Sequence, residues 1–202
     1  MTRRKPWVKV KDDAVKSILL ERDVGYLDVG IGPILETLNS VKNIATTSSC
    51  LGRIAIVEGI VHWGRDEDSR IAYKTHGKIT PEAILRVLSR GFSNLWLKAT
   101  GPILHARTNS LECALHMLSK ARENGFKHSG IISHGTPSGT VVELMSASQL
   151  STPLVVNGVV VIRMGREYLE ALANKANSTV EEGRRRLRSF VDSLLADPGP
   201  CG

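Results

Sequence analysis

The sequence has few cysteines and no long hydrophobic run, and each shortage excludes a class of protein. Only three of its 202 residues are cysteine, and Cys50, Cys113 and Cys201 lack the close spacing of metal ligands, so we expect no metal. An odd number of cysteines in a chain without a signal segment indicates the reducing cytoplasm rather than a disulfide-rich secreted fold. No apolar stretch is long enough to span a membrane.

Acidic residues are also fewer than basic residues. The chain has 27 Lys and Arg against 20 Asp and Glu, a formal net charge of +7. Clustered basic side chains bind phosphates by releasing counterions, so this excess fits a nucleic-acid partner as well as a basic enzyme surface. Gln149 is the only glutamine, and scarcity of glutamine is typical of thermophilic proteins.

The stretch YLDVGIGPILE at 26–36 looks at first like the cofactor loop of a doubly wound nucleotide-binding fold. Such a loop joins a buried strand to a helix through closely spaced glycines. Residues 21–26 are too polar for a buried parallel strand, and Ile34 stands where the fingerprint requires a small residue. We therefore expect a turn followed by a helix that begins at Pro33, and no Rossmann fold.

Helices and short strands follow one another in an order that predicts an α+β protein. Helical periodicity predicts helices over 10–23, 33–41, 80–88, 111–122 and 167–195. A period of two predicts strands over 44–47, 53–58, 70–74, 95–98, 103–107, 129–133, 140–145 and 159–163. The order helix, Gly-Phe, strand, strand occurs over about 80–108 and again over 110–146, which indicates an internal duplication. We expect one domain over 1–197 with a long C-terminal helix, and a disordered tail at 198–202.

The last helix carries a basic cluster opposite its apolar stripe. The cluster consists of Arg184, Arg185, Arg186 and Arg188. It fits either a solvated helical face paired with neighbouring glutamates or an edge that binds phosphates, and both interpretations stay open.

Three clusters carry residues suited to chemistry. In the first, TTSSCLGR at 46–53, hydroxyls and Arg53 can hold carboxylates, phosphates or ribose oxygens, although a polar turn is the simpler interpretation. The second, WLKATGPILH at 96–105, predicts a hairpin that brings His105 to a ligand or into the core. The third, NGFKHSG at 124–130, is explained by a helix cap and close backbone approach.

In this order the clusters resemble the signatures of the tRNA wybutosine-synthesizing protein 3 family. The matching stretches are SSCLGR at 48–53, ILH at 103–105 and GFKHSG at 125–130, and the similarity covers about 25–148. Two departures stand out: Thr100-Gly101 precede Pro102 where family members often have Glu-Pro, and Leu51 replaces a common serine.

The resemblance implies a methyltransferase that uses S-adenosylmethionine and has an α+β fold unlike the Rossmann methyltransferases. Its implied substrate is the tricyclic wyosine-type base next to the anticodon of tRNA(Phe), methylated at N-4 in the cytoplasm. We expect His105 to be catalytic, either positioning the base or accepting its proton. The expected cofactor-binding residues are Ser48, Ser49, Cys50, Gly52, Arg53, Ser129 and Gly130. The expected substrate-binding residues are Lys98, Lys127, His128 and Trp63.

Other classes of function remain as alternatives. The runner-up is a tRNA-binding module without catalytic activity, which would use the basic N-terminus and the arginine-rich helix. A hydrolase that uses Cys50 and His105 would need an activated thiol, whereas a small buried cysteine is more common. The oligomeric state is left open.

Overall fold

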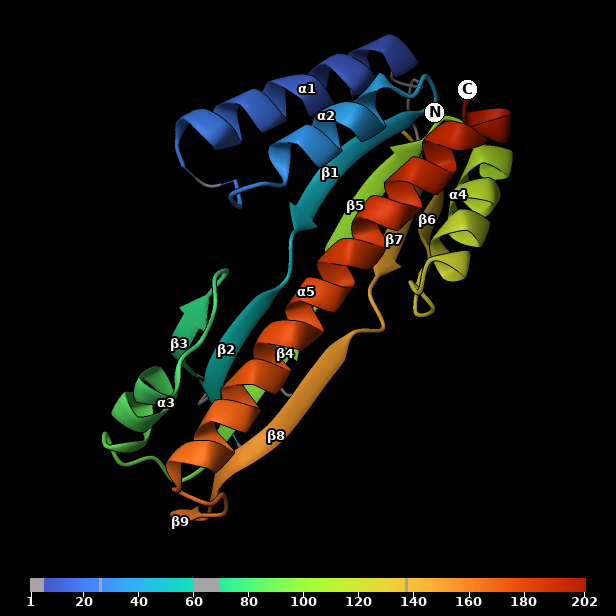
Figure 1. The fold of residues 1–202 in the computed structure, drawn as a ribbon. Helices are drawn as coiled ribbons and strands as arrows, with labels where there is room; N and C mark the ends of the chain where they lie inside the picture. The colour runs from blue at the N-terminus through green and yellow to red at the C-terminus, as the bar shows by residue number, and fades with distance from the viewer. Residues whose placement is uncertain (1–5, 26, 60–69, 137) are drawn as a thin grey trace. The chain divides into compact units, whose positions relative to one another are not determined.

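The computed structural model describes residues 6–25, 27–59, 70–136 and 138–202, which form two compact units (Figure 1). Unit one comprises 1–51, 102–147 and 184–202, and unit two comprises 52–101 and 148–183. Each unit has its own sheet, and the long helix α5 (Arg166–Ala196) contributes residues to both. The single domain expected from the sequence stays a prediction.

Unit one is built on a four-stranded sheet, here called sheet one, in the order β1-β5-β7-β6. Its strands are β1 (Ile44–Cys50), β5 (Ile103–Thr108), β6 (Gly130–Thr136) and β7 (Gly139–Met145). The helices α1 (Trp7–Asp23) and α2 (Gly32–Ser40) lie beside β1, and α4 (Leu111–Glu123) connects β5 to β6 (Figure 1). A 3-10 turn, η1 (Gly199–Cys201), ends the chain.

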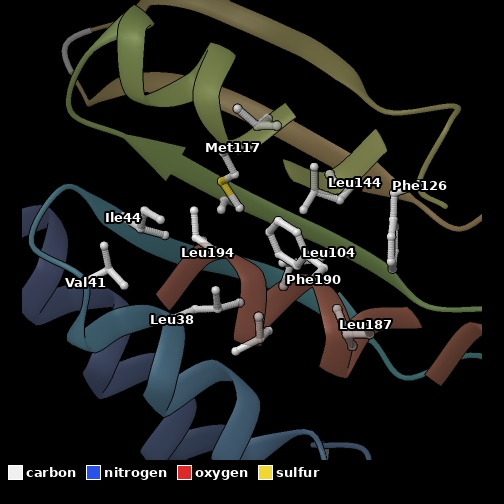
Figure 2. Packing of buried hydrophobic residues seen from close by; sticks show 14 of the residues in the cluster. Leu38, Val41, Ile44, Leu104, Met117, Phe126, Leu144, Leu187, Phe190 and Leu194 are labelled. Carbon is white, nitrogen blue, oxygen red and sulfur yellow. The ribbon is translucent and has the colours of Figure 1, made fainter. Parts of the chain in front are cut away.

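One face of sheet one is buried in the core of unit one. Alternate residues such as Leu104 and Leu144 point to this face and pack against Met117 of α4 and Phe190 of α5 (Figure 2). The rings of Phe126 and Phe190 lie 6.1 Å apart and tilted, a favourable aromatic arrangement. Since strand side chains alternate, the residues between these positions point to the opposite face.

A lysine on α1 connects the first two helices to sheet one through hydrogen bonds. Lys11 on α1 donates hydrogen bonds to the carbonyl oxygens of Asn39, Val41 (2.7 Å) and Ile44 (2.6 Å). The carbonyls of Asn39 and Val41 lie at the end of α2 and have no partner within the helix, and the carbonyl of Ile44 lies at the start of β1. Burial lowers the pKa of Lys11.

Unit two is built on a five-stranded sheet, here called sheet two, in the order β3-β2-β4-β8-β9. Its strands are β2 (Arg53–Glu58), β3 (Arg70–Thr75), β4 (Leu95–Thr100), β8 (Gln149–Val156) and β9 (Val159–Val160), with the helix α3 (Pro81–Leu88). Ile54, Ile56 and Leu97 form its core with residues of α5 such as Ala176 and Val180. Every strand pair that the structure describes in both units is antiparallel, which confirms that the fold is not doubly wound.

The predicted helix boundaries rest on local chemistry that the structure confirms. Thr80 caps α3 by accepting a hydrogen bond from the N–H of Ala83 at 3.3 Å, and Pro81 begins the helix. At the end of α4, Gly125 has φ +88° and Phe126 donates its N–H to the carbonyl of Ala121 at 2.9 Å. This Schellman pattern explains the Gly-Phe pair after the helix.

The helix, strand, strand order occurs in both expected segments, but their strands pair differently. β6 and β7 pair with each other, whereas β4 and β5 lie in different sheets. The hairpin expected over 96–105 is therefore wrong, because Gly101 and Pro102 carry the chain from sheet two into sheet one. Hydrophobic periodicity predicts strands but contains no information on which strands pair.

One strand was missed. The expected strand over 159–163 is reduced to the two residues of β9, and the longer β8 precedes it. β8 contains Pro153, a residue that argues against a strand because it cannot donate to a ladder. β9 pairs only with Val155 and Val156, so Pro153 has no partner on that side.

The end of the chain also differs from the expectation. Residues 198–202, expected to be a disordered tail, include η1, and Cys201 is buried and forms a disulfide with Cys113 of α4. The N–H of Asn43 donates to the carbonyl of Cys201 at 3.0 Å. The expectation failed because the two cysteines lie 88 positions apart, and such a spacing does not indicate a disulfide. No helix among the described residues is long and apolar enough to cross a membrane.

Candidate active site

Three side chains form a hydrogen-bonded chain on the face of sheet one opposite the core. Ser48 Oγ lies 2.7 Å from Nδ1 of His105, and Nε2 of His105 lies 2.6 Å from Oε2 of Glu143. The side chains of His105 and Glu143 are 27% and 32% exposed. We call these three residues the Ser-His-Glu chain.

The strand register explains how the chain forms. His105 lies between the buried Leu104 and Ala106, so its ring points away from the core, and Glu143 lies directly opposite on β7. On the other side, the pairing of β1 with β5 shifts between Thr46 and Ser49. The bulge sets two residues of β1 against His105, which turns the Ser48 hydroxyl towards the ring.

The distances fit an arrangement of protons in which His105 is neutral and carries its hydrogen on Nε2. An ionised carboxylate only accepts, so Nε2 of His105 carries the hydrogen that it donates to Glu143. In the neutral ring Nδ1 is then an acceptor and receives the hydroxyl hydrogen of Ser48. The oxygen of Ser48, an exposed residue, keeps lone pairs for a ligand. The arrangement is suited to accept a proton at Ser48 and pass one to His105.

Leu51 and Gly52 form the loop that follows β1, which we call the signature loop. Both the N–H and the carbonyl of Leu51 are hydrogen-bonded. Its N–H donates to Oδ2 of Asp28 at 2.8 Å, and its carbonyl accepts from Nε of Arg184 at 3.0 Å. Asp28 belongs to the glycine-containing stretch that resembles a cofactor loop, so that stretch secures the signature loop. The backbone of Leu51 is already paired, which makes the neighbouring side chains the better candidates for ligand contacts.

Two further residues of β1 lie next to Ser48. Ser49 Oγ is buried and has no hydrogen-bond partner among the residues that the structure describes. An unsatisfied buried hydroxyl is costly unless a ligand completes it. Cys50 is half-buried at the end of the strand and lies outside the disulfide. Because both ring nitrogens of His105 are engaged by Ser48 and Glu143, the structure does not favour a Cys50–His105 hydrolase.

The third cluster contributes to the same face through Gly130. Gly130 pairs with Glu143, and a Cβ placed on it would have no atom within 4 Å, so the space beside Glu143 is open. Ser129 is buried, and its hydroxyl accepts a hydrogen bond from the N–H of Met145 at 3.1 Å. That bond holds the start of β6 against β7. The cofactor-binding roles of both residues stay predictions.

Other predicted site residues belong to unit two. Gly52 has φ +89°, and a Cβ there would lie 2.6 Å from the carbonyl oxygen of Thr100, so only glycine fits. Arg53 is exposed at the start of β2, and Lys98 is half-buried on β4. Their predicted roles in binding the cofactor and the substrate are not tested by this geometry. Trp63 lies outside the described residues.

Lys127 lines a basic groove between the end of α4 and α5, with a volume of about 340 Å³. We call it the basic groove, and its lining residues are Arg122, Glu123, Asn124, Gly125, Lys127, Arg185, Arg186 and Ser189. His128 is exposed beside it. Arg185 and Arg186 of the arginine cluster therefore line the same groove as residues of the third sequence cluster. Arg184 instead donates a hydrogen bond to the signature loop.

Glu143 is a candidate site residue that sequence reasoning missed. It is the only charged residue of β7 and lies in the alternating stretch VVELM. The feature that could have identified it is a carboxylate on the strand face opposite the buried side chains. Only the register of β5 with β7 shows that its partner is His105.

Comparisons with known proteins agree with this fold and show the family of the chain. Residues 9–196 match the family model described as Methyltransferase TYW3. The chain is 47% identical over 178 residues to a tRNA(Phe) 7-((3-amino-3-carboxypropyl)-4-demethylwyosine(37)-N(4))-methyltransferase of Aeropyrum pernix, covering 88% of this chain and 93% of the relative. A protein of Saccharolobus solfataricus with the same name is 32% identical over 190 residues, covering 93% and 89%.

Two solved structures have the same fold. A crystal structure of a protein from Aeropyrum pernix is similar with a TM-score of 0.76 and 44% identity, covering 84% of this chain and 98% of that chain. A structure of a protein from Pyrococcus horikoshii is similar with a TM-score of 0.83 and 29% identity, covering 96% and 98%.

Proposed function

Because the chain belongs to the Methyltransferase TYW3 family, we propose that it methylates N-4 of the wyosine-type base at position 37 of tRNA(Phe), using S-adenosylmethionine in the cytoplasm. The names of its relatives support this reaction and substrate. Within the chain, the observation that carries the proposal is the Ser-His-Glu chain on the outer face of sheet one.

S-adenosylmethionine supplies the methyl group on an activated sulfonium centre. Ser49 pairs with Leu104, so its side chain points to the face of β1 opposite Ser48, where its buried hydroxyl lacks a partner among the described residues and can accept a bound polar group. We assign the contacts with the cofactor to the signature residues Ser48, Ser49, Cys50, Gly52 and Arg53. We assign Gly130, at the start of β6, and Ser129, just before it, to the same site.

The Ser-His-Glu chain accounts for the proton that the base must lose. Bound S-adenosylmethionine would supply the methyl group to N-4, and the proton on N-4 would then have to leave. Ser48 Oγ takes this proton and gives its own to Nδ1 of His105, so the ring becomes an imidazolium. Glu143, hydrogen-bonded to Nε2, stabilises the positive ring electrostatically.

We assign the basic groove to the phosphates of the tRNA. Lys127 and Arg185 are exposed there, and the side chain of Arg186 lies against Gly125, where an added Cβ would be 2.6 Å from its Nη1. Positive charge near the C-terminus of α4 also stabilises that helix through the helix dipole. This structural role is compatible with phosphate binding. Lys98, Lys127 and His128 complete the expected substrate contacts.

The groove is tested by reversing its charge. Lys127→Glu and Arg185→Glu should each weaken tRNA binding and reduce the slope of log affinity against log salt by about one. Filter binding at several salt concentrations measures both quantities. Lys175→Glu, on an exposed position of α5 in unit two, is the matched control. An equal loss for Lys175→Glu would contradict the assignment, because it would show only the effect of net charge.

The reaction is tested with tRNA(Phe) that carries the unmethylated tricyclic base. After incubation with methyl-labelled S-adenosylmethionine, mass spectrometry of the nucleosides should find the label on that base at N-4. His105→Asn is the control, since it keeps a polar side chain but cannot relay a proton. A protein that binds the tRNA but ignores S-adenosylmethionine would instead be the tRNA-binding module considered as the alternative.

A further inference from the structure

A second groove lies between α1 and the outer face of sheet one, with a volume of about 280 Å³. We call it the α1 groove. Its lining residues are Val10, Asp13, Ala14, Ser17, Ala45, Thr46, Thr47, Arg107 and Ser138. Thr47 joins it to the candidate active site, because its hydroxyl donates to the carbonyl oxygen of His105 at 3.3 Å.

Arg107 is the most informative residue of this groove. It follows His105 by two positions on β5, so both side chains point to the same face, with their Cα atoms about 7 Å apart. Arg107 is half-buried, yet its guanidinium has no hydrogen-bond or ion-pair partner in the part of the chain that the structure describes. A half-buried guanidinium without a protein partner is available to bind an anion. Its planar fork matches a carboxylate or a phosphate.

The rest of the lining selects between these two anions. Val10, Ala14 and Ala45 give the groove an apolar wall that suits a short hydrocarbon chain. The carboxylate of Asp13 also lines it, and a negative group would repel a phosphate but attract an ammonium. A cation, an anion and an apolar wall together match an α-amino acid on a short carbon chain better than a nucleic-acid backbone.

We propose that the α1 groove binds a 3-amino-3-carboxypropyl group, with its carboxylate on Arg107, its methylenes against the apolar wall and its ammonium near Asp13. This inference rests on the proposed function. Two reactants of the proposed methyl transfer carry this group. One is the base that appears in the names of the relatives, and the other is S-adenosylmethionine, whose amino-acid part has the same structure. Either source has its other end at the reacting atoms, which places it beside the Ser-His-Glu chain.

Equilibrium binding to Arg107→Met tests the proposal without requiring turnover. The three ligands are S-adenosylmethionine, tRNA(Phe) whose tricyclic base carries the 3-amino-3-carboxypropyl group, and the same tRNA whose base lacks it. Loss of the bidentate contact should weaken binding by about tenfold for one source only. Weaker binding of S-adenosylmethionine identifies the cofactor. Weaker binding of the tRNA with the group, but not of the tRNA without it, identifies the substrate.

Two matched variants control for folding and charge. Arg163→Met removes an exposed arginine between β9 and α5, outside both grooves, and should leave all three affinities unchanged. Arg107→Lys keeps the positive charge but not the fork and should retain part of the binding. Unchanged affinities in Arg107→Met, or an equal loss for both tRNAs with no change for S-adenosylmethionine, would overturn the proposal.

The result also separates this inference from the proposed function. Wild-type protein that methylates the base while Arg107→Met binds all three ligands normally would overturn the inference alone. Wild-type protein that binds neither S-adenosylmethionine nor either tRNA would overturn both.

Discussion

Sheet one and sheet two each bury one face in a core, but the faces that point away from the two cores carry different side chains. In sheet one, the outer side chains of three adjacent strands join into the Ser-His-Glu chain. In sheet two, the corresponding face of β4 carries Trp96 and Lys98, and Trp96 donates its indole N–H to the carbonyl of Gly59 at 3.1 Å. The first arrangement can move a proton, whereas the second offers an aromatic surface and a cation.

This difference suggests a division of labour within one chain. Alternation along each strand buries one face and leaves the other available, so the covered faces stabilise and the outer faces carry the chemistry. A histidine paired with a glutamate on sheet one suits catalysis, and Lys98 on sheet two suits binding of the polyanionic tRNA. The two cores and the two outer faces can therefore be perturbed one at a time.

The largest effect is expected from a cavity in either core. Phe190→Ala in unit one should lower the free energy of unfolding by about 3–5 kcal/mol, and Leu97→Ala in unit two by about 2–5 kcal/mol, since both side chains are fully buried. Because α5 contributes to both cores, we expect each variant to shift one shared transition in urea, followed by circular dichroism. Two separate transitions, each moved by only one variant, would show that the units unfold independently.

A smaller loss of stability is expected from reduction of the disulfide, which is confined to unit one. Cys113–Cys201 joins residues 88 positions apart, and its loss should cost about 2–4 kcal/mol, mainly through the entropy of the unfolded chain. Thermal unfolding with and without dithiothreitol measures this difference. Cys201→Ser should reproduce the reduced protein and no longer respond to reductant. Equal stability of the oxidised and reduced wild type would contradict the expectation.

The smallest effect is expected from the ion pair beside that disulfide. Lys120 lies 2.8 Å from Asp197, and this hydrogen bond lowers the pKa of Asp197 below its usual value. The carboxylate therefore contributes stability above the pKa of the unfolded chain, and this contribution is lost as the pH falls through the lowered folded value. Asp197→Asn should slightly lower the melting temperature at neutral pH and have no effect in acid, whereas the exposed Asp192→Asn should show no such pH dependence. A constant difference at all pH values would refute this account.

The sequence predicts the local features well because their causes are local. Thr80 and Pro81 begin a helix, and Gly125 ends one, through contacts within a few residues. The features that failed depend on distant partners. The separation of β4 from β5, the strand around Pro153 and the disulfide of Cys201 depend on pairings that periodicity and composition do not encode.

The candidate site shows the same limit. The shared signatures placed Ser48 and His105 in one site, and the structure brings them within 2.7 Å. Glu143 was missed because a lone glutamate in an apolar strand is interpretable only with its register. Arg107 was missed because its lack of a partner is a property of the folded protein.

Steady-state methyl transfer by variants of the two outer faces tests the central claim most directly. Glu143→Gln and His105→Asn, on sheet one, should lower kcat by about tenfold or more, on the order of 1.4 kcal/mol, with little change in KM for tRNA. Lys98→Met, on sheet two, should raise KM for tRNA and leave kcat nearly unchanged. If instead the sheet-one variants keep their kcat while Lys98→Met loses it, the proton is not handled by Ser48, His105 and Glu143, and the proposed division of labour is wrong.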